Sequence, residues 1–285
     1  MTALNGKGVL VTGATSGIGE AVALRLASAG ANTVISGRNA EKGEKVLEGL
    51  RGAGPGRSTF VAADLTTADG PIALAREAEE WLGGVDILVN NAATGGAGHS
   101  TGISVDDWDA VFAVNVRAPY LLSTHLMKGM SERGSGVVVN VTTSVAYRGW
   151  PGYSAYASSK AALDAMTRCW AATYGLWGVR VNAISPGPVL TPASLRESAA
   201  EDIAEFCSGF GAGRYGTVDE VAAAVQFLVG PEAEYIHAST LHIDGGMVET
   251  FGYQPISVRT VAREPGSPEA APVAARRRLR DRFRA

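Results

Sequence analysis

Tyr156 and Lys160 are the pair of residues whose types and spacing most clearly suggest catalysis. They stand four residues apart in a segment, 156–174, with the pattern of a helix, so both side chains share one helix face. A free tyrosine has a pKa near ~10 and is a poor base at neutral pH. A lysine ammonium one turn away favours the phenolate. Tyr156 can therefore act as a general acid and, once ionised, as a general base.

A second group of residues has the composition of a phosphate-binding loop. The run Gly13-Ala-Thr-Ser-Gly17-Ile-Gly19 directly follows the apolar segment 8–12 and precedes a helical segment. At a strand-to-helix turn, glycines permit a tight turn, close approach of a pyrophosphate and packing of the helix on the sheet. The helix N-terminus adds free N–H groups and a partial positive charge. We therefore expect a dinucleotide phosphate to be bound by Gly13, Thr15, Ser16, Gly17, Ile18 and Gly19.

The elements that must position these residues are short apolar runs that alternate with helical segments over residues 1–250. Nearly continuous apolar runs are typical of strands buried on both faces of a parallel sheet. Their alternation with helices implies right-handed crossovers, and we expect a single-domain Rossmann-type α/β fold, doubly wound, with about seven strands and helices on both faces. The expected strands are 8–12, 33–36, 59–62, 87–90, 137–141, 180–184 and 240–243. The expected helices are 17–29, 41–50, 72–81, 106–130, 156–174 and 219–229.

Composition narrows the functional classes. The chain has 285 residues, a net charge of −3 and two cysteines, which are too few to staple a fold of this size. No apolar run reaches the ~18 residues of a membrane span, and the N-terminus lacks a signal pattern. We expect a cytoplasmic protein that binds neither a membrane nor a metal. The four histidines, which lack metal-site spacing, are His99, His125, His237 and His242.

The last part of the chain, 251–285, differs from the rest. It contains eight arginines and three acidic residues, a net charge of +5, which leaves −8 for residues 1–250. We expect a flexible, basic tail outside a catalytic domain that spans 1–250. The arginine run is too short to indicate a nucleic-acid-binding module, so no nucleic acid partner is expected. Docking of the tail to an acidic partner such as a carrier protein stays an alternative.

Further short motifs follow along the chain in a fixed order. Thr12 precedes the glycine spacing G-x-x-x-G-x-G, Asn90-Asn91-Ala92 follows the fourth expected strand, and Asp244-Gly245-Gly246 follows the last. With the tyrosine–lysine pair, these motifs make residues 6–248 resemble the classical short-chain dehydrogenase/reductase family. Short matches at 94–102 and 213–215 are similar to 3-oxoacyl and polyketide ketoreductases. The remaining landmarks are Asp64-Leu65, Asn115, and Pro186-Gly187 with Thr191.

The resemblance implies a third catalytic group, which hydrogen-bonds the carbonyl oxygen of the substrate. The family places a serine thirteen residues before the tyrosine, where this chain has Thr143. Two interpretations stay open: Thr143 supplies the hydroxyl, which the ungapped spacing favours, or a one-residue deletion brings Ser144 into this place. The resemblance also implies that Asn115 bends its helix and holds a water that links Lys160 to solvent. Lys160 would in addition bind the nicotinamide ribose.

The residues after the second expected strand indicate which dinucleotide is bound. NAD enzymes usually place an acidic residue here for the adenosine ribose, whereas this chain has Gly37 followed by Arg38. A guanidinium can pair with a 2′-phosphate that a carboxylate would repel. We therefore expect NADP(H) rather than NAD(H). The resemblance places Asp64 and Leu65 at the adenine, Asn91 and Ala92 at the central section of the cofactor, and Pro186, Gly187, Val189 and Thr191 among the other cofactor-binding residues.

Two features concern the space available to the substrate. Ala93 stands where the family has a glycine, and its methyl group narrows the room beside the cofactor. Several aromatic residues near the expected site could wall a roomy apolar pocket or pack as ordinary core residues, and both interpretations stay open. These residues are Tyr147, Trp150, Tyr153, Phe206, Phe210 and Tyr215.

Together these observations predict an NADPH-dependent ketoreductase that interconverts a ketone and a secondary alcohol. Its substrate would be a small carbonyl or alcohol compound, either free or bound to a carrier. The alternatives are an alcohol-oxidising dehydrogenase and a non-catalytic dinucleotide-binding sensor or scaffold, although a pure binder would not need Tyr156, Lys160 and Asn115 together. The resemblance also implies a homodimer or homotetramer whose interface is formed by the helices that hold Asn115 and Tyr156.

Overall fold

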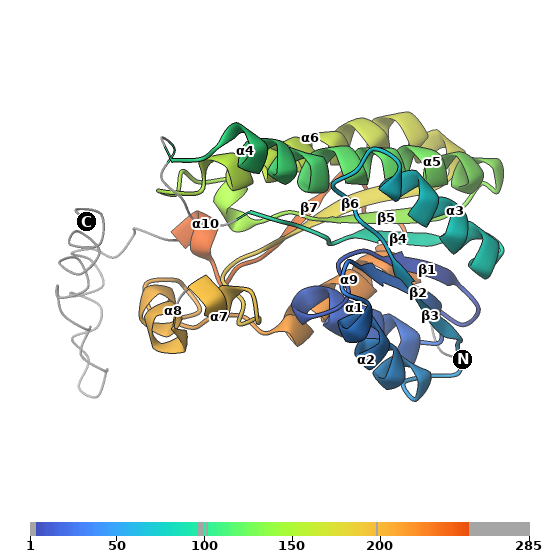
Figure 1. Cartoon of the computed structure of the whole chain (residues 1–285), viewed down its shortest axis with the longest axis horizontal. Coiled ribbons are helices and arrows are strands. Elements are labelled where there is room, and N and C mark those ends of the chain that lie inside the picture. Colours follow the sequence, from blue (N-terminus) through green and yellow to red (C-terminus); the bar gives the residue numbers. More distant parts are fainter. Residues whose placement is uncertain (1–3, 96–99, 101, 198, 251–285) are drawn as a thin grey trace.

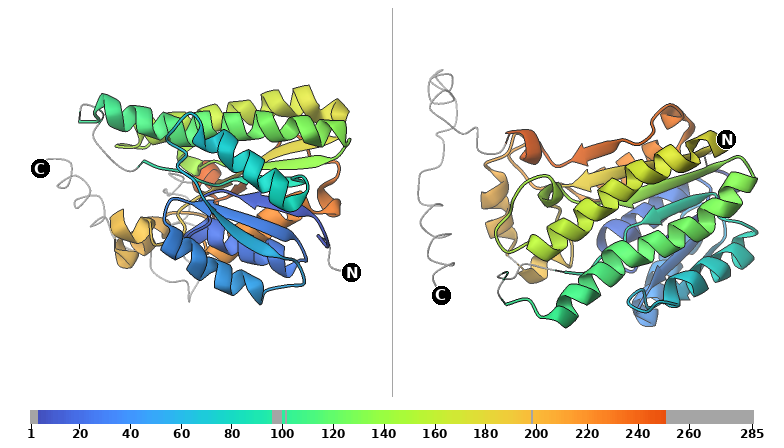
Figure 2. Two further views of the ribbon diagram at one scale, coloured as in Figure 1. Left: turned by 45° about the vertical axis from the view of Figure 1, so that its right-hand side comes forward. Right: turned by 90° about the horizontal axis from the view of Figure 1, so that it is seen from above.

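A seven-stranded sheet forms the centre of the computed structural model (Figures 1 and 2). The structure describes residues 4–95, 100, 102–197 and 199–250. All neighbouring strands are parallel, in the order β3-β2-β1-β4-β5-β6-β7, so the winding direction reverses between β1 and β4. The strands are β1 (Gly8–Val11), β2 (Asn32–Gly37), β3 (Ser58–Ala62), β4 (Ile87–Asn90), β5 (Gly136–Val141), β6 (Val179–Pro186) and β7 (Thr240–Ile243).

This arrangement confirms the predicted doubly wound α/β fold. Each of the seven predicted apolar runs forms a strand, and β1 and β4 are buried along their whole length, as continuous apolar runs in a parallel sheet should be. Several strand boundaries differ from the prediction by one or two residues. Thr12 lies outside β1, and β6 continues to Pro186, two residues beyond the predicted end.

Two layers of helices cover the two faces of the sheet (Figure 1). Alternate residues of β1 face opposite layers: Val9 and Val11 pack in the core beneath α1, α2 and α9, whereas Leu10 packs in the core beneath α3, α5 and α6. The helices are α1 (Gly17–Ser28), α2 (Ala40–Arg51), α3 (Gly70–Leu82), α4 (Val105–Phe112), α5 (Ala118–Glu132), α6 (Ser154–Tyr174), α7 (Ser194–Glu197), α8 (Ala200–Cys207), α9 (Val218–Val229) and α10 (Met247–Thr250).

The helix predicted over 106–130 is interrupted in the structure. A π-helical turn, Ala113–Arg117, separates α4 from α5. Pro119 has no backbone N–H, so the α-helical hydrogen bond to the carbonyl oxygen of Asn115 cannot form. π-helical turns inside α-helices occur frequently at functional sites, and this one contains Asn115.

The small helices α7, α8 and α10 lie together at one end of the sheet (Figure 1). Ile203, Cys207, Phe210 and Met247 form a separate apolar cluster there. No described helix is long and apolar enough to cross a membrane. Three features named above lie outside the described residues, wholly or in part. They are His99, part of the segment 94–102, and the predicted basic tail, 251–285.

Candidate active site

A cavity of about 610 Å³ opens at the carboxyl ends of the strands, beside the point where the winding direction reverses. Ligands of doubly wound sheets bind at this point. Most of the predicted site residues line this cavity, although they come from segments far apart in the sequence: Gly13, Thr15, Ser16, Gly17, Ile18, Gly19, Arg38, Leu65, Asn91, Ala92, Thr143, Tyr156, Lys160, Pro186, Gly187, Val189 and Thr191. Asp64, Asn115 and Ser144 are not among the described residues that line it.

The glycine loop between β1 and α1 packs tightly at Gly13 and Gly19, where a Cβ would lie within 3 Å of neighbouring atoms. Gly13 has a φ of +64°, and a Cβ there would lie 2.7 Å from the Cα of Ala92. Thr12 holds the loop against the end of β4: its Oγ1 accepts hydrogen bonds from the backbone N of Asn91 at 3.1 Å and of Ala92 at 3.0 Å. Ser16, the N-cap of α1, makes no side-chain bond to the helix within the described structure. The first N–H groups of α1 are therefore available to an anion.

Lys160 and Tyr156 lie on successive turns of α6 and line the same cavity. The Lys160 side chain is 1% exposed, and its Nζ donates a hydrogen bond to the carbonyl oxygen of Val141 at 2.7 Å. Burial lowers the pKa of Lys160 to about 7, because the ammonium loses its hydration. Tyr156 is half-buried, with its ring near that of Tyr153. The pair predicted from spacing is therefore formed at the cavity wall.

The two candidates for the third catalytic group are placed differently. Thr143 lines the cavity with Tyr156 and Lys160. Ser144 is 2% exposed, and its Oγ donates a hydrogen bond to the Sδ of Met247 at 3.1 Å. This geometry favours Thr143 for contact with a substrate.

Asn115 lies behind the cavity wall rather than in it. Its Oδ1 accepts a hydrogen bond from the backbone N of Thr94 at 2.9 Å. Its Nδ2 donates to the carbonyl oxygen of Thr94 at 2.8 Å and to the Oγ of Ser159 at 3.0 Å. Asn115 thus connects the segment after β4 to the turn of α6 that carries Tyr156 and Lys160. The water that the resemblance assigns to Asn115 stays a prediction.

The end of β2 carries a cationic group in the place expected for the adenosine ribose. A Cβ on Gly37 would lie 2.5 Å from the Cγ2 of Thr15, so the acidic residue of NAD enzymes does not fit here unless Thr15 moves. Arg38 and Lys42 are both exposed and line this end of the cavity. The Oδ1 of Asn39 accepts a hydrogen bond from the backbone N of Lys42 at 2.8 Å, which fixes the start of α2. Our sequence reasoning missed Lys42, although a second cation four residues after Arg38 was a usable signal.

Asp64 is exposed and is not among the described residues that line the cavity. Its Oδ1 accepts hydrogen bonds from the backbone N and the hydroxyl of Thr66, at 2.9 Å and 2.7 Å. These bonds, the backbone one foremost, lower the pKa of Asp64 below its usual value. Its neighbour Leu65 does line the cavity.

The aromatic residues near the site mostly pack on one another. The rings of Trp150 and Phe206 are 4.9 Å apart, and those of Phe206 and Phe210 are 4.8 Å apart, both edge to face. Trp150, Phe206 and Tyr215 also pack against the apolar cluster that contains Met247. Of the six aromatic residues, Tyr153 is the one found among the described lining residues.

Sequence reasoning also missed part of the wall formed by α7. Ser194 and Arg196 line the cavity after Thr191. The Oγ of Ser194 accepts a hydrogen bond from the backbone N of Thr191 at 2.9 Å and donates one to the carbonyl oxygen of Val189 at 3.0 Å. No pattern in the sequence distinguishes this serine from others in the segment.

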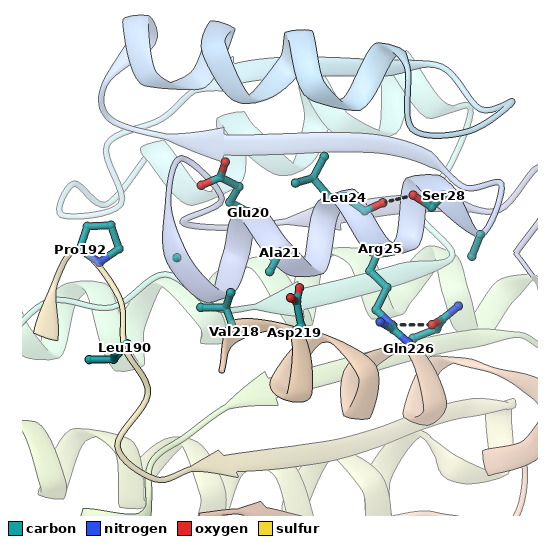
Figure 3. A pocket seen from close by; sticks show the side chains of 12 residues that line it. Glu20, Ala21, Leu24, Arg25, Ser28, Leu190, Pro192, Val218, Asp219 and Gln226 are labelled. Carbon is teal, nitrogen blue, oxygen red and sulfur yellow. Dashed lines mark hydrogen bonds between the residues drawn. The ribbon is translucent and has the colours of Figure 1, made fainter. Parts of the chain in front are cut away.

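A second hollow lies between α1 and α9 (Figure 3). Arg25 of α1 links the two helices there, because its Nε donates a hydrogen bond to the Oε1 of Gln226 on α9 at 2.7 Å. None of the predicted catalytic residues is among its described lining. In the described parts of the chain, no three His, Cys, Asp or Glu side chains gather where they could hold a metal ion.

Comparisons with known proteins show what the chain is similar to. The family model described as enoyl-(acyl carrier protein) reductase matches residues 13–248. The chain is 35% identical to 3-oxoacyl-(acyl-carrier-protein) reductase FabG of Thermotoga maritima, over 86% of this chain and 99% of that protein. It is 33% identical to gluconate 5-dehydrogenase of Gluconobacter oxydans, over 86% of this chain and 95% of that protein. A solved short-chain dehydrogenase from Burkholderia cenocepacia J2315, in complex with NADP, matches with a TM-score of 0.79 and 37% identity, over 86% of this chain and 98% of that one.

The family-model match, residues 13–248, spans nearly the whole described fold and the positions of the glycine loop, Thr143, Tyr156 and Lys160. The chain belongs to the classical short-chain dehydrogenase/reductase family of oxidoreductases.

Proposed function

We propose that the protein is an NADP(H)-dependent ketoreductase that interconverts a ketone and a secondary alcohol. One observation carries the proposal: Tyr156, Lys160 and Thr143 share a cavity with the glycine loop that precedes α1. A dinucleotide can bind at this loop, because the loop lines the cavity and the N-terminus of α1 offers free N–H groups.

Thr143, Tyr156 and Lys160 each have a separate role in the proposed reaction. When bound, the dinucleotide supplies or accepts the hydride. Thr143 donates a hydrogen bond to the carbonyl oxygen, and Tyr156 gives this oxygen its phenolic proton. Lys160 stabilises the phenolate that results. Although burial lowers the pKa of Lys160, the negative charge of the Tyr156 phenolate, one turn away on α6, favours the ammonium form.

The preference for NADP(H) over NAD(H) is supported by the end of β2. Arg38 and Lys42 are two cations positioned to meet a 2′-phosphate, and Gly37 cannot be replaced by an acidic residue while Thr15 keeps its place. The related protein from Burkholderia cenocepacia was solved with NADP. Leu65, Asn91, Ala92, Pro186, Gly187, Val189 and Thr191 would complete the cofactor site.

The substrate is proposed as a small ketone, free or bound to a carrier. The similarity to FabG of Thermotoga maritima favours a 3-oxoacyl compound, whereas the similarity to gluconate 5-dehydrogenase keeps alcohol oxidation as the second candidate. Direction depends on the substrate and on the ratio of the two cofactor forms. A non-catalytic sensor is the less favoured reading, because such a protein would not need the tyrosine–lysine pair at the cavity.

We also propose a homodimer or homotetramer with the helices around Asn115 and Tyr156 at the interface. Trp108 on α4 and Tyr120 on α5 support this proposal, because both aromatic side chains are more than two-fifths exposed in the single chain. Light scattering coupled to size-exclusion chromatography measures the assembly. Monomeric protein at micromolar concentration would contradict it.

The function is tested with purified protein and a panel of probe substrates. The panel contains ethyl acetoacetate, cyclohexanone, and the acetoacetyl and crotonyl thioesters of N-acetylcysteamine. We expect at least one ketone to be reduced, with a higher kcat/KM for NADPH than for NADH. Turnover of the crotonyl thioester alone would point instead to reduction of a carbon–carbon double bond. Tight NADPH binding without any turnover would support the sensor.

A further inference from the structure

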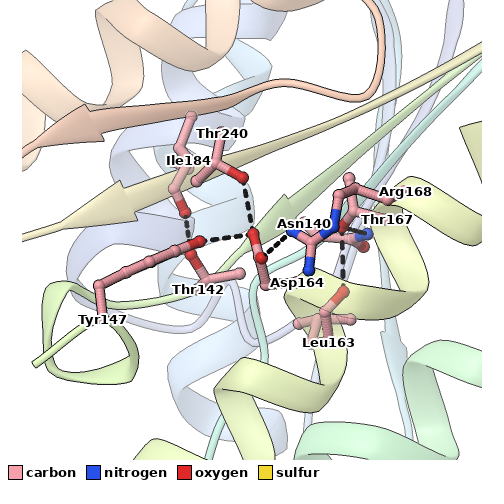
Figure 4. Close-up of polar contacts among 9 residues, drawn as sticks. All are labelled: Asn140, Thr142, Tyr147, Leu163, Asp164, Thr167, Arg168, Ile184 and Thr240. Carbon is pink, nitrogen blue, oxygen red and sulfur yellow. Dashed lines mark hydrogen bonds and ion pairs between the residues drawn. The ribbon is translucent and has the colours of Figure 1, made fainter.

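Asp164 is a buried carboxylate on α6, the helix that also carries Tyr156 and Lys160. Its Oδ1 accepts hydrogen bonds from the hydroxyl of Tyr147 at 2.5 Å and from the hydroxyl of Thr240 at 2.6 Å (Figure 4). Its Oδ2 pairs with the guanidinium of Arg168, one turn further along the helix. This carboxylate therefore joins α6 to β7 and to the segment that follows β5.

The three donors offset the cost of burying this charge. Burial acts to raise the pKa of Asp164, but the hydrogen bonds from Thr240, Tyr147 and Arg168 leave it below its usual value. The pKa of Tyr147 is raised to about 12, first by burial and then by its bond to the carboxylate. At neutral pH the phenol therefore keeps its proton and the carboxylate keeps its charge.

Tyr147 fixes one end of the segment that contains Thr143. At the other end, both the backbone N and the hydroxyl of Thr142 donate hydrogen bonds to the carbonyl oxygen of Ile184 on β6, each at 2.8 Å. A short 3₁₀ turn lies between these ends, closed by a bond from the backbone N of Ala146 to the carbonyl oxygen of Thr143 at 3.1 Å. Thr143 thus lies between one anchor on the sheet and one anchor on α6.

We propose that Asp164, acting through Tyr147, positions Thr143 relative to Tyr156 for binding of the carbonyl oxygen. The proposal rests on the proposed function, because it takes Thr143 as the group that hydrogen-bonds the substrate. Asp164 follows Tyr156 by eight residues on one continuous helix, so the helix backbone fixes the separation of these two side chains. The bond to Tyr147 extends this fixed frame to Thr143. Asp164 and Tyr147 are positioning residues, since neither is among the described residues that line the cavity.

An effect of the Asp164 charge on Lys160, one turn away, is the competing explanation. The contacts favour positioning. The Nζ of Lys160 bonds to the carbonyl oxygen of Val141, and burial is the cause of its lowered pKa. Both oxygens of Asp164 instead face donors from outside the cavity.

The first test is Tyr147→Phe, which removes the hydroxyl and keeps the ring. With the best ketone of the panel we expect kcat to fall about tenfold, because a small misplacement of a catalytic group is costly, while the Kd for NADPH stays within about twofold. Tyr235→Phe is the matched control, since Tyr235 is fully exposed, and it should leave kcat unchanged. An unchanged kcat in Tyr147→Phe would overturn the proposal.

A double variant separates this proposal from the proposed function. If Tyr147 acts through Thr143, adding Tyr147→Phe to Thr143→Ala should cost nothing further, because the group to be positioned is already gone. A further tenfold loss would overturn the positioning role and leave the role of Thr143 standing. An unchanged kcat in Thr143→Ala alone would instead refute the catalytic role of Thr143, and the positioning proposal would fall with it.

Two Asp164 variants distinguish positioning from charge. Asp164→Asn keeps an oxygen acceptor for Tyr147, whereas Asp164→Ala removes it. Positioning predicts that the Asn variant keeps most of its kcat, while an effect of charge predicts that both variants lose equally.

Hydrogen exchange measured by mass spectrometry tests whether Tyr147 fixes the segment 142–147, and it needs no measurement of activity. Tyr147→Phe should speed exchange in peptides that span 142–147 and leave the peptides of β1 and α1 unchanged. Unchanged exchange at 142–147 would contradict the proposal.

Discussion

The Cγ2 methyl of Thr15 occupies the space that any side chain at position 37 would need, since a Cβ on Gly37 would lie 2.5 Å from it. Thr15 belongs to the glycine loop and Gly37 ends β2, so these two segments are fitted to each other. Which residue can stand at position 37 therefore depends on which residue stands at position 15. With no side chain at position 37, Arg38 and Lys42 line this end of the cavity, and we propose that they meet the ribose end of the cofactor.

Removing the two cations should weaken NADPH binding selectively. We expect Arg38→Ala to raise the Kd for NADPH about tenfold to a hundredfold, because a charge-assisted hydrogen bond contributes roughly 1.5–3 kcal/mol. Lys42→Ala should act in the same direction with a smaller effect. The Kd for NADH, which lacks the 2′-phosphate, should change less than about twofold. Titration of the intrinsic fluorescence measures both constants, and equal losses for the two cofactors would refute the assignment.

Converting the cofactor preference should require two substitutions. Gly37→Asp alone should lower the melting temperature and impair binding of both cofactors, because its Cβ collides with Thr15. Thr15→Ala removes the colliding methyl, so the double variant should recover stability and bind NADH better than NADPH. Thermal unfolding and cofactor titration of the three variants check this. A stable, NADH-preferring Gly37→Asp single variant would show that Thr15 does not restrict this position.

Substitution of the two neighbouring hydroxyl residues should separate their roles. Thr143→Ala should lower kcat about 100-fold, the scale of losing one hydrogen-bond donor to a developing oxyanion. Ser144→Ala should change kcat less than about threefold, since its hydroxyl bonds to Met247 away from the cavity. Steady-state kinetics with the best ketone compares them. The reverse order of effects would place Ser144 at the substrate.

Burial of Lys160 should make the free energy of unfolding of the cofactor-free protein depend on pH. Below about pH 7 this lysine is protonated in both the folded and unfolded chains, so the folded state bears the full cost of burying the charge. Between about pH 7 and its usual value of 10.5 the unfolded state binds more protons, and the cost disappears as pH rises. Lys160→Met should therefore be more stable than the wild type near pH 6, by up to about 5 kcal/mol, and this advantage should shrink by about pH 9.

Urea unfolding at the two pH values measures this difference. Lys128→Met, which alters an exposed lysine of α5, is the control. Its free energy of unfolding should differ from that of the wild type by the same amount at both pH values. A Lys160→Met advantage that does not depend on pH would contradict the account of this lysine.

The sequence predicts most of the fold because the strands are continuous apolar runs. The bounds of β4 and β7 match the predicted ranges, 87–90 and 240–243. The helix over 106–130 was predicted without its π-helical turn, since apolar periodicity does not report which backbone bond is lost. The proline at position 119 is the one local signal of this interruption.

Whether a site residue could be predicted from the sequence depends on how far apart in the sequence its interaction partners lie. The glycine loop and the tyrosine–lysine pair are local motifs, and the structure brings them to one cavity. Asp64 accepts a bond from its near neighbour Thr66 and is not among the described lining residues, which a family landmark does not reveal. The bond from Tyr147 to Asp164 could not be predicted, because it joins residues whose approach depends on how α6 packs beside β5.

Substitution of Tyr156 tests the central claim most directly. Tyr156→Phe removes only the phenolic oxygen, so the fold and the Kd for NADPH should stay unchanged within about twofold. Since the proton donor is lost, kcat for the best ketone should fall by at least about 100-fold, measured as NADPH oxidation. A Tyr156→Phe enzyme that binds NADPH and reduces the ketone at the wild-type rate would contradict this account.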